Sequence, residues 1–447
     1  MLSTLNDRVY LRLFLAQVIA LIGTGLATIA LGLLAFELAG NDAALVLGFV
    51  FTIKMVAYVG VTPFASALSE SFDRRSLLVA LDVARAIVAL CLPFVTQLWH
   101  VYVLIFLLQS ASAAFTPVFQ ATIPDVLPEE ERYTRALSLS RLAYDLENIV
   151  SPILAGILLS VASHNALFYG TSLGFFASAL LVLTLVLPAA APSRKPLGFC
   201  RRTTRGIRFY LATPRLRALL SLNLAVAAPG AMVLVNSVVL VRGALGLDDN
   251  ALAWAMFAFG LGSMVSAIAL PRFLDSLSDR FVMLLGSTLS MIAVVSLATT
   301  VSFVGLRWHT LLFAWFVVGL GYSATLTPAG RLLRRSSGPS ERTAIFAAHF
   351  ALSHVCWLLA YPLAGWLMTR YGAVAALFAL ATLSAAATVA ASRMWSRGDP
   401  QRLEHTHDNL PLEHPHLRGV RTHSHALIID EDHPKWDSYF PPHHYAP

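Results

Sequence analysis

The chain has 447 residues, of which 57% are hydrophobic and 13% are charged, with a mean hydropathy of +0.68. An average soluble domain carries about 25% charged residues, so this composition excludes an ordinary soluble protein and indicates a polytopic membrane protein. The formal net charge of +7 comes from short connections between apolar runs, so nucleic-acid binding is not needed to explain it. Cys91, Cys200 and Cys356 are widely spaced and imply no disulfide framework.

Apolar runs of about 20 residues, each long enough to cross a hydrocarbon core about 30 Å thick, recur along the chain. They predict an all-α membrane protein with twelve transmembrane helices. No cleavage site follows the first run, so we interpret it as a retained span and not as a signal peptide. The expected spans are 11–37, 44–68, 76–97, 100–122, 138–161, 166–188, 216–241, 250–270, 281–304, 309–328, 343–368 and 371–392.

Lys and Arg gather on alternate connections between these spans, and the connection after the sixth span is the richest. The positive-inside rule then places the basic connections and both termini in the cytoplasm. The long basic connection divides the spans into two sets of six, as expected of parallel repeats that rock around a central site. The predicted units are an N-terminal half at 1–188, a basic linker at 189–215, a C-terminal half at 216–392 and a cytoplasmic tail at 393–447.

The fifth span begins with two acids, Asp145 and Glu147. A charge near the bilayer centre costs roughly 2.5–3.5 kcal/mol on insertion scales, so such an acid usually faces a cavity, a partner charge or a cation. Positions two apart on an ideal helix point about 200° apart, so both acids cannot face one ion. Pro152 can free a carbonyl beside them. We expect substrate or proton binding; the alternative is that Asp145 pairs with Arg141 and Glu147 caps a gate.

Two other predicted spans carry buried charges. Lys54 in the second span could pair with Asp145 or Glu147 and be displaced from that acid when a cation binds. Asp82 and Arg85 in the third span are three residues apart and are expected to pair with each other.

The eleventh span contains two histidines, His349 and His354. Five positions correspond to about 140° on a helix, so these two do not share a face. His349, Ser353 and Cys356 do share one and could offer nitrogen, oxygen and sulfur to a cation. The alternative is that each histidine is a hydrogen-bonded packing residue.

The tail holds nine of the 14 histidines of the chain. Its H-x-H pairs repeat at a spacing of nine, and in an extended chain residues i and i+2 project to the same side. Each pair can therefore present two imidazoles to one metal ion, and imidazole suits Ni, Cu and Zn. The alternative is a solvated tail without metal. The candidate metal ligands are His405, His407, His414, His416, His423, His425 and His433.

Two short sequences resemble signatures of the major facilitator superfamily. Residues 66–75 read SALSESFDRR, similar to the G-x-x-x-D-R-x-x-R-R type signature, with Ser66, Glu70 and Ser71 in place of Gly, Asp and Arg. Residues 151–156 read SPILAG and resemble the G-P-x-x-G-G signature of exporters. The resemblance implies the major facilitator fold and export. We assign gating to Glu70, Asp73, Arg74, Arg75, Arg141 and Pro152.

A finer resemblance combines AYDLE at 143–147, LSRL before it, LDVARA at 81–86, and the tail strings HDNLPLEHPHL at 407–417 and HSHALIIDEDHPKW at 423–436. Together they resemble bacterial nickel-resistance exporters of the superfamily, which end in a histidine-rich cytoplasmic tail. This resemblance implies transported or tail-bound Ni²⁺ or Co²⁺ and no tightly bound cofactor.

These observations predict a monomeric exporter in a bacterial inner membrane that expels Ni²⁺ or Co²⁺ in exchange for protons and confers metal resistance. Its expected partners are the lipid bilayer, a divalent metal ion and the proton, with no nucleic acid. The sequence has no nucleotide-binding motif and no nucleophile triad, so we expect no enzyme. One alternative is a proton-coupled exporter of hydrophobic or siderophore-like molecules, which predicts a large aromatic-lined cavity. The other is a membrane-bound metal sensor.

Overall fold

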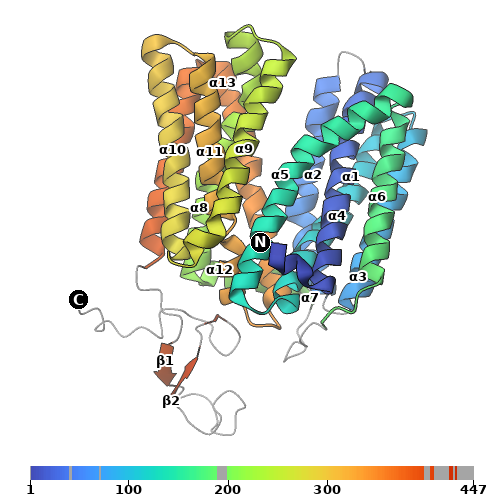
Figure 1. Ribbon diagram of the computed structural model, residues 1–447, viewed down its shortest axis with the longest axis vertical. Coiled ribbons are helices and arrows are strands. Elements are labelled where there is room, and N and C mark those ends of the chain that lie inside the picture. The colour runs from blue at the N-terminus through green and yellow to red at the C-terminus, as the bar shows by residue number, and fades with distance from the viewer. Residues whose placement is uncertain are drawn as a thin grey trace.

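The computed structural model describes residues 2–39, 43–69, 72–188, 199–396, 403–406, 422–425 and 428–429. Long helices dominate these residues, and Figure 1 shows them in two bundles that lie side by side. The first bundle contains α1 (Arg8–Ala39), α2 (Ala43–Ser69), α3 (Arg74–Cys91), α4 (Leu98–Val126), α5 (Glu130–Val161) and α6 (Asn165–Leu183). The second contains α8 (Pro214–Val238), α9 (Asp249–Leu274), α10 (Asp279–Val304), α11 (Trp308–Leu326) and α13 (Arg342–Met394).

The prediction of twelve spans is confirmed. The helix α13 is bent at Gly372, whose φ of 81° falls in the left-handed region that glycine adopts most easily, and it supplies the last two spans. Among the described residues, nine helices are long and apolar enough to cross a membrane, with α13 counted once. The remaining spans are α2 and α5, and α5 carries the charges Arg141, Asp145 and Glu147.

Short elements connect the spans. The basic linker predicted at 189–215 contains a helix of its own, α7 (Phe199–Ala212), and α12 (Ala329–Arg335) precedes α13. The remaining short helices are 3-10 helices at Leu2–Asn6 and Leu92–Phe94 and a π-helix at Val239–Ala244.

Within each half, the helices pack closely enough to need small residues at their contacts. In the second half, α9 meets α11 where Gly262 faces the backbone of Phe316 and Gly319 faces the backbone of Phe259, and a Cβ on either glycine would overlap a carbonyl oxygen. In the first half, α1 contacts α5 and α6, and α2 contacts α4. Between the halves, α2 and α4 contact α13, and α5 contacts α9.

One end of the bundle carries the N-terminus, α7 and α12 (Figure 1). We call it the basic end, because arginines cluster on the short helices and helix starts that lie there. These arginines are Arg74, Arg205, Arg331, Arg334 and Arg342.

Part of the tail lies below the basic end in Figure 1. Its strands β1 (Leu403–Thr406) and β2 (Thr422–His425) pair antiparallel, with His405 opposite His423. Ile429 is buried in a cluster with Trp395 and Leu216, so the tail returns to the second half. The other predicted tail ligands, His407, His414, His416 and His433, lie outside the described residues, and the metal site there stays a prediction.

Candidate functional site

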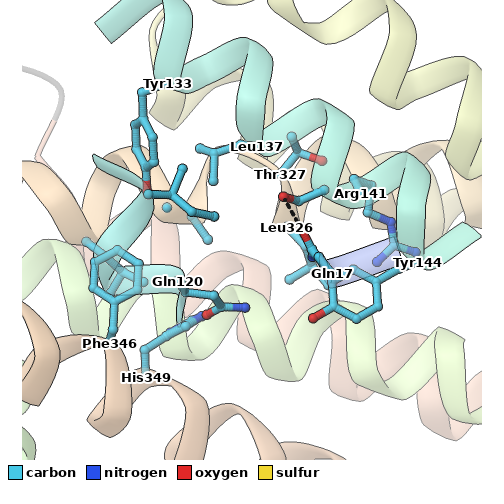
Figure 2. A pocket seen from close by; sticks show the side chains of 15 residues that line it. Gln17, Gln120, Tyr133, Leu137, Arg141, Tyr144, Leu326, Thr327, Phe346 and His349 are labelled. Atoms are coloured by element: carbon cyan, nitrogen blue, oxygen red, sulfur yellow. Dashed lines mark hydrogen bonds between the residues drawn. The ribbon is translucent and has the colours of Figure 1, made fainter. Parts of the chain in front are cut away.

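A cavity of about 480 Å³ lies between the two halves. Residues of α1 to α5 line one side, and residues of α8, α11, α12 and α13 line the other. A smaller cavity of about 170 Å³ adjoins it toward the basic end, and Figure 2 shows its lining. Seven residues line both cavities and form the boundary between them, namely Gln17, Gln120, Arg141, Tyr144, Leu326, Ala329 and His349.

Glu147 is the acid of α5 that lines the large cavity, whereas Asp145 is not among its lining residues. Lys54 of α2 lines the same cavity and interacts electrostatically with Glu147. The Nζ of Lys54 also lies 5.6 Å from the centre of the Tyr58 ring. The cavity lining therefore includes one carboxylate and one ammonium group that are close enough to interact.

Asp145 is buried and lies near the contact between α5 and α9. Arg141 donates to its carboxylate at 2.9 Å, and the Nε of Arg141 donates to Ser263 of α9 at 3.1 Å. The guanidinium of Arg141 also lies 4.6 Å from the centre of the Tyr322 ring of α11. The alternative pairing of Asp145 with Arg141 is thus confirmed, and the pair joins α5 to α9 and α11.

The expected pair of Asp82 and Arg85 is also confirmed. Ser178 donates a second hydrogen bond to Asp82 at 2.7 Å, and Arg85 lies between the rings of Phe115 and Phe175 at 4.1 and 4.6 Å. Arg85 lines the cavity, but its positive charge is paired with the carboxylate of Asp82, which is not a lining residue.

Aromatic rings form much of the cavity wall in the second half. Tyr322, Trp357 and Tyr361 follow one another with ring centres 6.1 and 5.2 Å apart. Tyr58 of α2 contacts Phe350 of α13, and the centres of the two rings are 5.0 Å apart. Rings spaced in this way can bind flat or apolar groups through stacking and edge contacts.

The two histidines of α13 both line the large cavity, although they do not share a helix face, because the cavity wraps around a wide arc of this helix. His349 contacts the hydroxyl of Tyr210 of α7 at 3.1 Å, and His354 contacts the carbonyl of Phe350 at 2.7 Å. Cys356 packs against α8 and is not a lining residue. In the described part of the chain, no three His, Cys, Asp or Glu residues are grouped closely enough to hold a metal ion.

Ion pairs connect the two halves at the basic end. Asp125 at the end of α4 accepts from Arg74 of α3 at 2.6 Å and from Arg342 at the start of α13. Arg331 of α12 donates to Glu130 of α5 at 2.7 Å. We call this set the ion-pair belt. The small cavity is lined by Tyr133 of α5 and Leu333 of α12, the two helices that Glu130 and Arg331 join, so the belt connects the halves beside this cavity.

The predicted gating residues take different positions. Arg74 belongs to the ion-pair belt, and Arg75 donates to the carbonyl of Leu185. Asp73 caps α3: the backbone amide and hydroxyl of Ser76 donate to its carboxylate and hold its pKa below the usual value. Glu70 lies outside the described residues, and α5 continues as a helix through position 152.

Sequence reasoning did not identify Asp125 as the partner of Arg74 and Arg342, or Tyr322 and Trp357 as cavity residues. The signal for Asp125 was an acid at the end of a predicted span, in the sequence TIPDV. The aromatic residues gave no comparable signal, because a ring in an apolar span can face lipid, a neighbouring helix or a cavity.

Gly25 of α1 allows the close approach that positions Glu147. A Cβ at Gly25 would overlap the side chain of Ser151 and lie 3.4 Å from Cγ of Glu147. We expect Gly25→Ala to destabilise the protein by about 1–3 kcal/mol through overpacking and to slow transport. Melting temperature and transport rate measure the two effects, with Gly60→Ala as the control, because a Cβ there meets nothing within 4 Å. Equal melting temperatures and equal transport rates for the two variants would show that the α1 contact at Gly25 is not tightly packed.

Comparisons with known proteins agree with this geometry. A family model described as Major Facilitator Superfamily matches residues 13–239 and 219–428. An uncharacterized MFS-type transporter of Bacillus subtilis, YfiS, is 24% identical over 72% of this chain and 78% of its own length. Macrolide efflux protein A of Streptococcus pyogenes is 25% identical over 46% of this chain, and the match spans 51% of that protein.

Solved structures share the fold. The human organic anion transporter MFSD10 superimposes with a TM-score of 0.74 at 12% identity, over 86% of this chain and 99% of that one. A bacterial homologue of the iron transporter ferroportin, in an outward-facing state, gives a TM-score of 0.69 at 14% identity, over 86% and 98%. At these identities the likeness shows a common fold and nothing about cargo.

Proposed function

Because this chain belongs to the major facilitator superfamily, we propose that it exports an amphipathic organic molecule in exchange for protons. The observation that carries the proposal is the aromatic-walled cavity of about 480 Å³ with Glu147 and Lys54 inside it. Aromatic rings can bind an organic body, and a carboxylate in a cavity can exchange a proton with water. Relatives whose names describe macrolide efflux and multidrug resistance support export as the direction.

The proposed orientation places the basic end in the cytoplasm of a bacterial inner membrane, as the positive-inside rule expects. In this orientation the ion-pair belt joins the two halves on the cytoplasmic side, and we assign it the role of the cytoplasmic gate. Cargo would enter from the cytoplasm when the belt opens, and Glu147 would take up a proton when the cavity faces the other side. We propose a monomer as the transporting unit.

Nickel or cobalt export is the second candidate, and the histidine-rich tail favours it, since β1 and β2 bring His405 opposite His423. The cavity gives it less support. Lys54 lines it outside any ion pair among the described residues, and its positive charge raises the cost of bringing in a divalent cation. We therefore assign metal binding to the tail, as a proposal separate from the cargo.

The test is accumulation in proteoliposomes driven by a pH gradient, measured for a panel of fluorescent amphipaths and for Ni²⁺. We expect at least one organic probe to accumulate and Ni²⁺ not to. Accumulation of Ni²⁺ and of no organic probe would contradict the organic cargo and identify the metal as the transported species. No movement of any cargo, by this chain or by the triple variant Ser66→Gly, Glu70→Asp and Ser71→Arg, would favour the membrane-bound sensor.

The tail and the cavity are separable in this account. Replacing all nine tail histidines with alanine is expected to leave the rate of organic export unchanged and to abolish equilibrium binding of Ni²⁺ to the purified protein, because neutral imidazoles are the proposed ligands. Isothermal titration and transport assays on the same preparation check both expectations. Loss of organic export in this variant would show that the tail serves the cargo route.

A further inference from the structure

The charges that line the large cavity sum to zero once their partners are counted. Four lining residues are charged: Lys54, Arg85, Arg141 and Glu147. Arg85 pairs with Asp82, and Arg141 pairs with Asp145, so each of these arginines is already neutralised. Among the residues that the structure describes, Lys54 and Glu147 are the two lining charges outside such ion pairs.

Lys54 and Glu147 both line the cavity and attract each other electrostatically. Within the described chain, neither side chain makes an ion pair within 4.0 Å or a hydrogen bond. Both line the cavity and both are only half-buried, so a bound molecule can reach them. An ammonium and a carboxylate held apart in this way leave room for a group that bridges them.

We propose that the cargo is an amphipathic aromatic molecule without net charge that presents an anionic or acceptor group to Lys54 and a cationic or donor group to Glu147. This inference rests on the proposed export of organic molecules and names their charge class. A purely cationic cargo would leave the ammonium of Lys54 uncompensated in a site partly removed from water. A purely anionic cargo would do the same to Glu147. Both situations are costly, because an unpaired charge loses its hydration without gaining a partner.

Competition at Glu147 would couple this cargo to the proton. The groups that face Glu147 are Lys54 and Tyr58 from α2 and Tyr144 from its own helix, and Lys54 is also coupled to His354 of α13. The cationic group of the cargo and a proton cannot both occupy the carboxylate.

The cargo-loaded cavity is neutral, whereas the protonated cavity keeps the charge of Lys54. One positive charge therefore moves inward for each neutral cargo exported, and an inside-negative potential should accelerate export.

The experiment uses four forms of one fluorescent scaffold: norfloxacin, which is zwitterionic near neutral pH, its methyl ester, which is cationic, its N-acetyl derivative, which is anionic, and the N-acetyl methyl ester, which is uncharged. Equilibrium binding to the purified full chain and proton-driven accumulation are measured for each. We expect the zwitterion to bind at least about tenfold more tightly than the cation or the anion, the change typical of losing one desolvated charge partner.

Variants of the two charged residues make the test reciprocal. Lys54→Met should shift the binding preference to the cationic ester, Glu147→Gln should shift it to the anionic derivative, and Lys54→Arg should keep the preference for the zwitterion. Size-exclusion chromatography confirms that each variant is folded before binding is measured. An unchanged order in both charge-removing variants, or a preference of the natural chain for the cation, would overturn the inference and leave organic export standing. If no organic probe of any charge moves, the proposed function itself fails.

Discussion

Replacing Glu147 with glutamine is expected to reduce proton-driven accumulation of organic cargo to the level of protein-free liposomes. Glu147 is the carboxylate that lines the large cavity, and an amide cannot take up and release a proton there. The other acid of α5, Asp145, is engaged by Arg141 and does not line the cavity, so it is not placed to take over the role. The measurement is accumulation of a fluorescent probe against its gradient under an imposed pH difference.

Glu131→Gln is the matched control for this loss. Glu131 is an exposed acid of the same helix, paired with Arg135 at the basic end, so its removal changes the same chemical group outside the cavity. We expect this variant to accumulate the probe normally. Accumulation by Glu147→Gln at the rate of the control would contradict the assignment of the proton to Glu147.

Replacing Asp125 with asparagine is expected to open the basic end. Asp125 accepts charge-assisted hydrogen bonds from Arg74 and from Arg342, which lie on different halves of the bundle. Without the carboxylate these two guanidinium groups repel each other across the contact. Losing such bonds costs about 1.5–3 kcal/mol, so the population closed at the basic end should fall by roughly 10- to 100-fold relative to the open one.

Cysteine accessibility measures this opening. In a background where Cys91, Cys200 and Cys356 are replaced by alanine, a cysteine at Leu137 in the small cavity is treated with a water-soluble maleimide. The reaction should be slow with Asp125 present and faster in Asp125→Asn. The conservative variant Arg342→Lys, which keeps a positive charge, should stay close to the slow rate. Equal rates with and without the carboxylate would mean that the ion-pair belt does not hold the halves together.

The sequence was sufficient to predict the fold, because each span is an apolar run of nearly the length observed. The last two spans illustrate this: the boundary expected near 370 coincides with the bend at Gly372, where the backbone passes through a positive φ that glycine adopts most easily. The helix α7 was not predicted, because its arginines are typical of a basic connection as well as of the polar face of a helix.

The site was predictable only in part. Helix geometry correctly separated Asp145 from Glu147, but the rotation of α5 against α1 and α9 decides which acid lines the cavity, and that depends on contacts such as Gly25 with Ser151. For the same reason the order of His349 and Cys356 along α13 did not reveal that one lines the cavity and the other packs against α8.

The gate shows a further limit of local patterns. The signature at residues 66–75 led to the prediction that Arg74 takes part in gating. Its partner Asp125 is 51 residues away, and Arg342 is 217 residues from that aspartate. A motif within ten residues contains no information about such partners. Only the packing of the two halves brings the three side chains together.

Proton movement triggered by added cargo tests most directly whether this chain exchanges protons for an organic molecule. Proteoliposomes containing the full chain and a luminal pH dye are mixed with norfloxacin and, separately, with Ni²⁺, and protein-free liposomes correct for passive entry. We predict that entry of the organic probe drives protons out and raises the luminal pH, and that Glu147→Gln abolishes this rise. A rise triggered by Ni²⁺ and by no organic probe would contradict the account and identify the metal as the cargo.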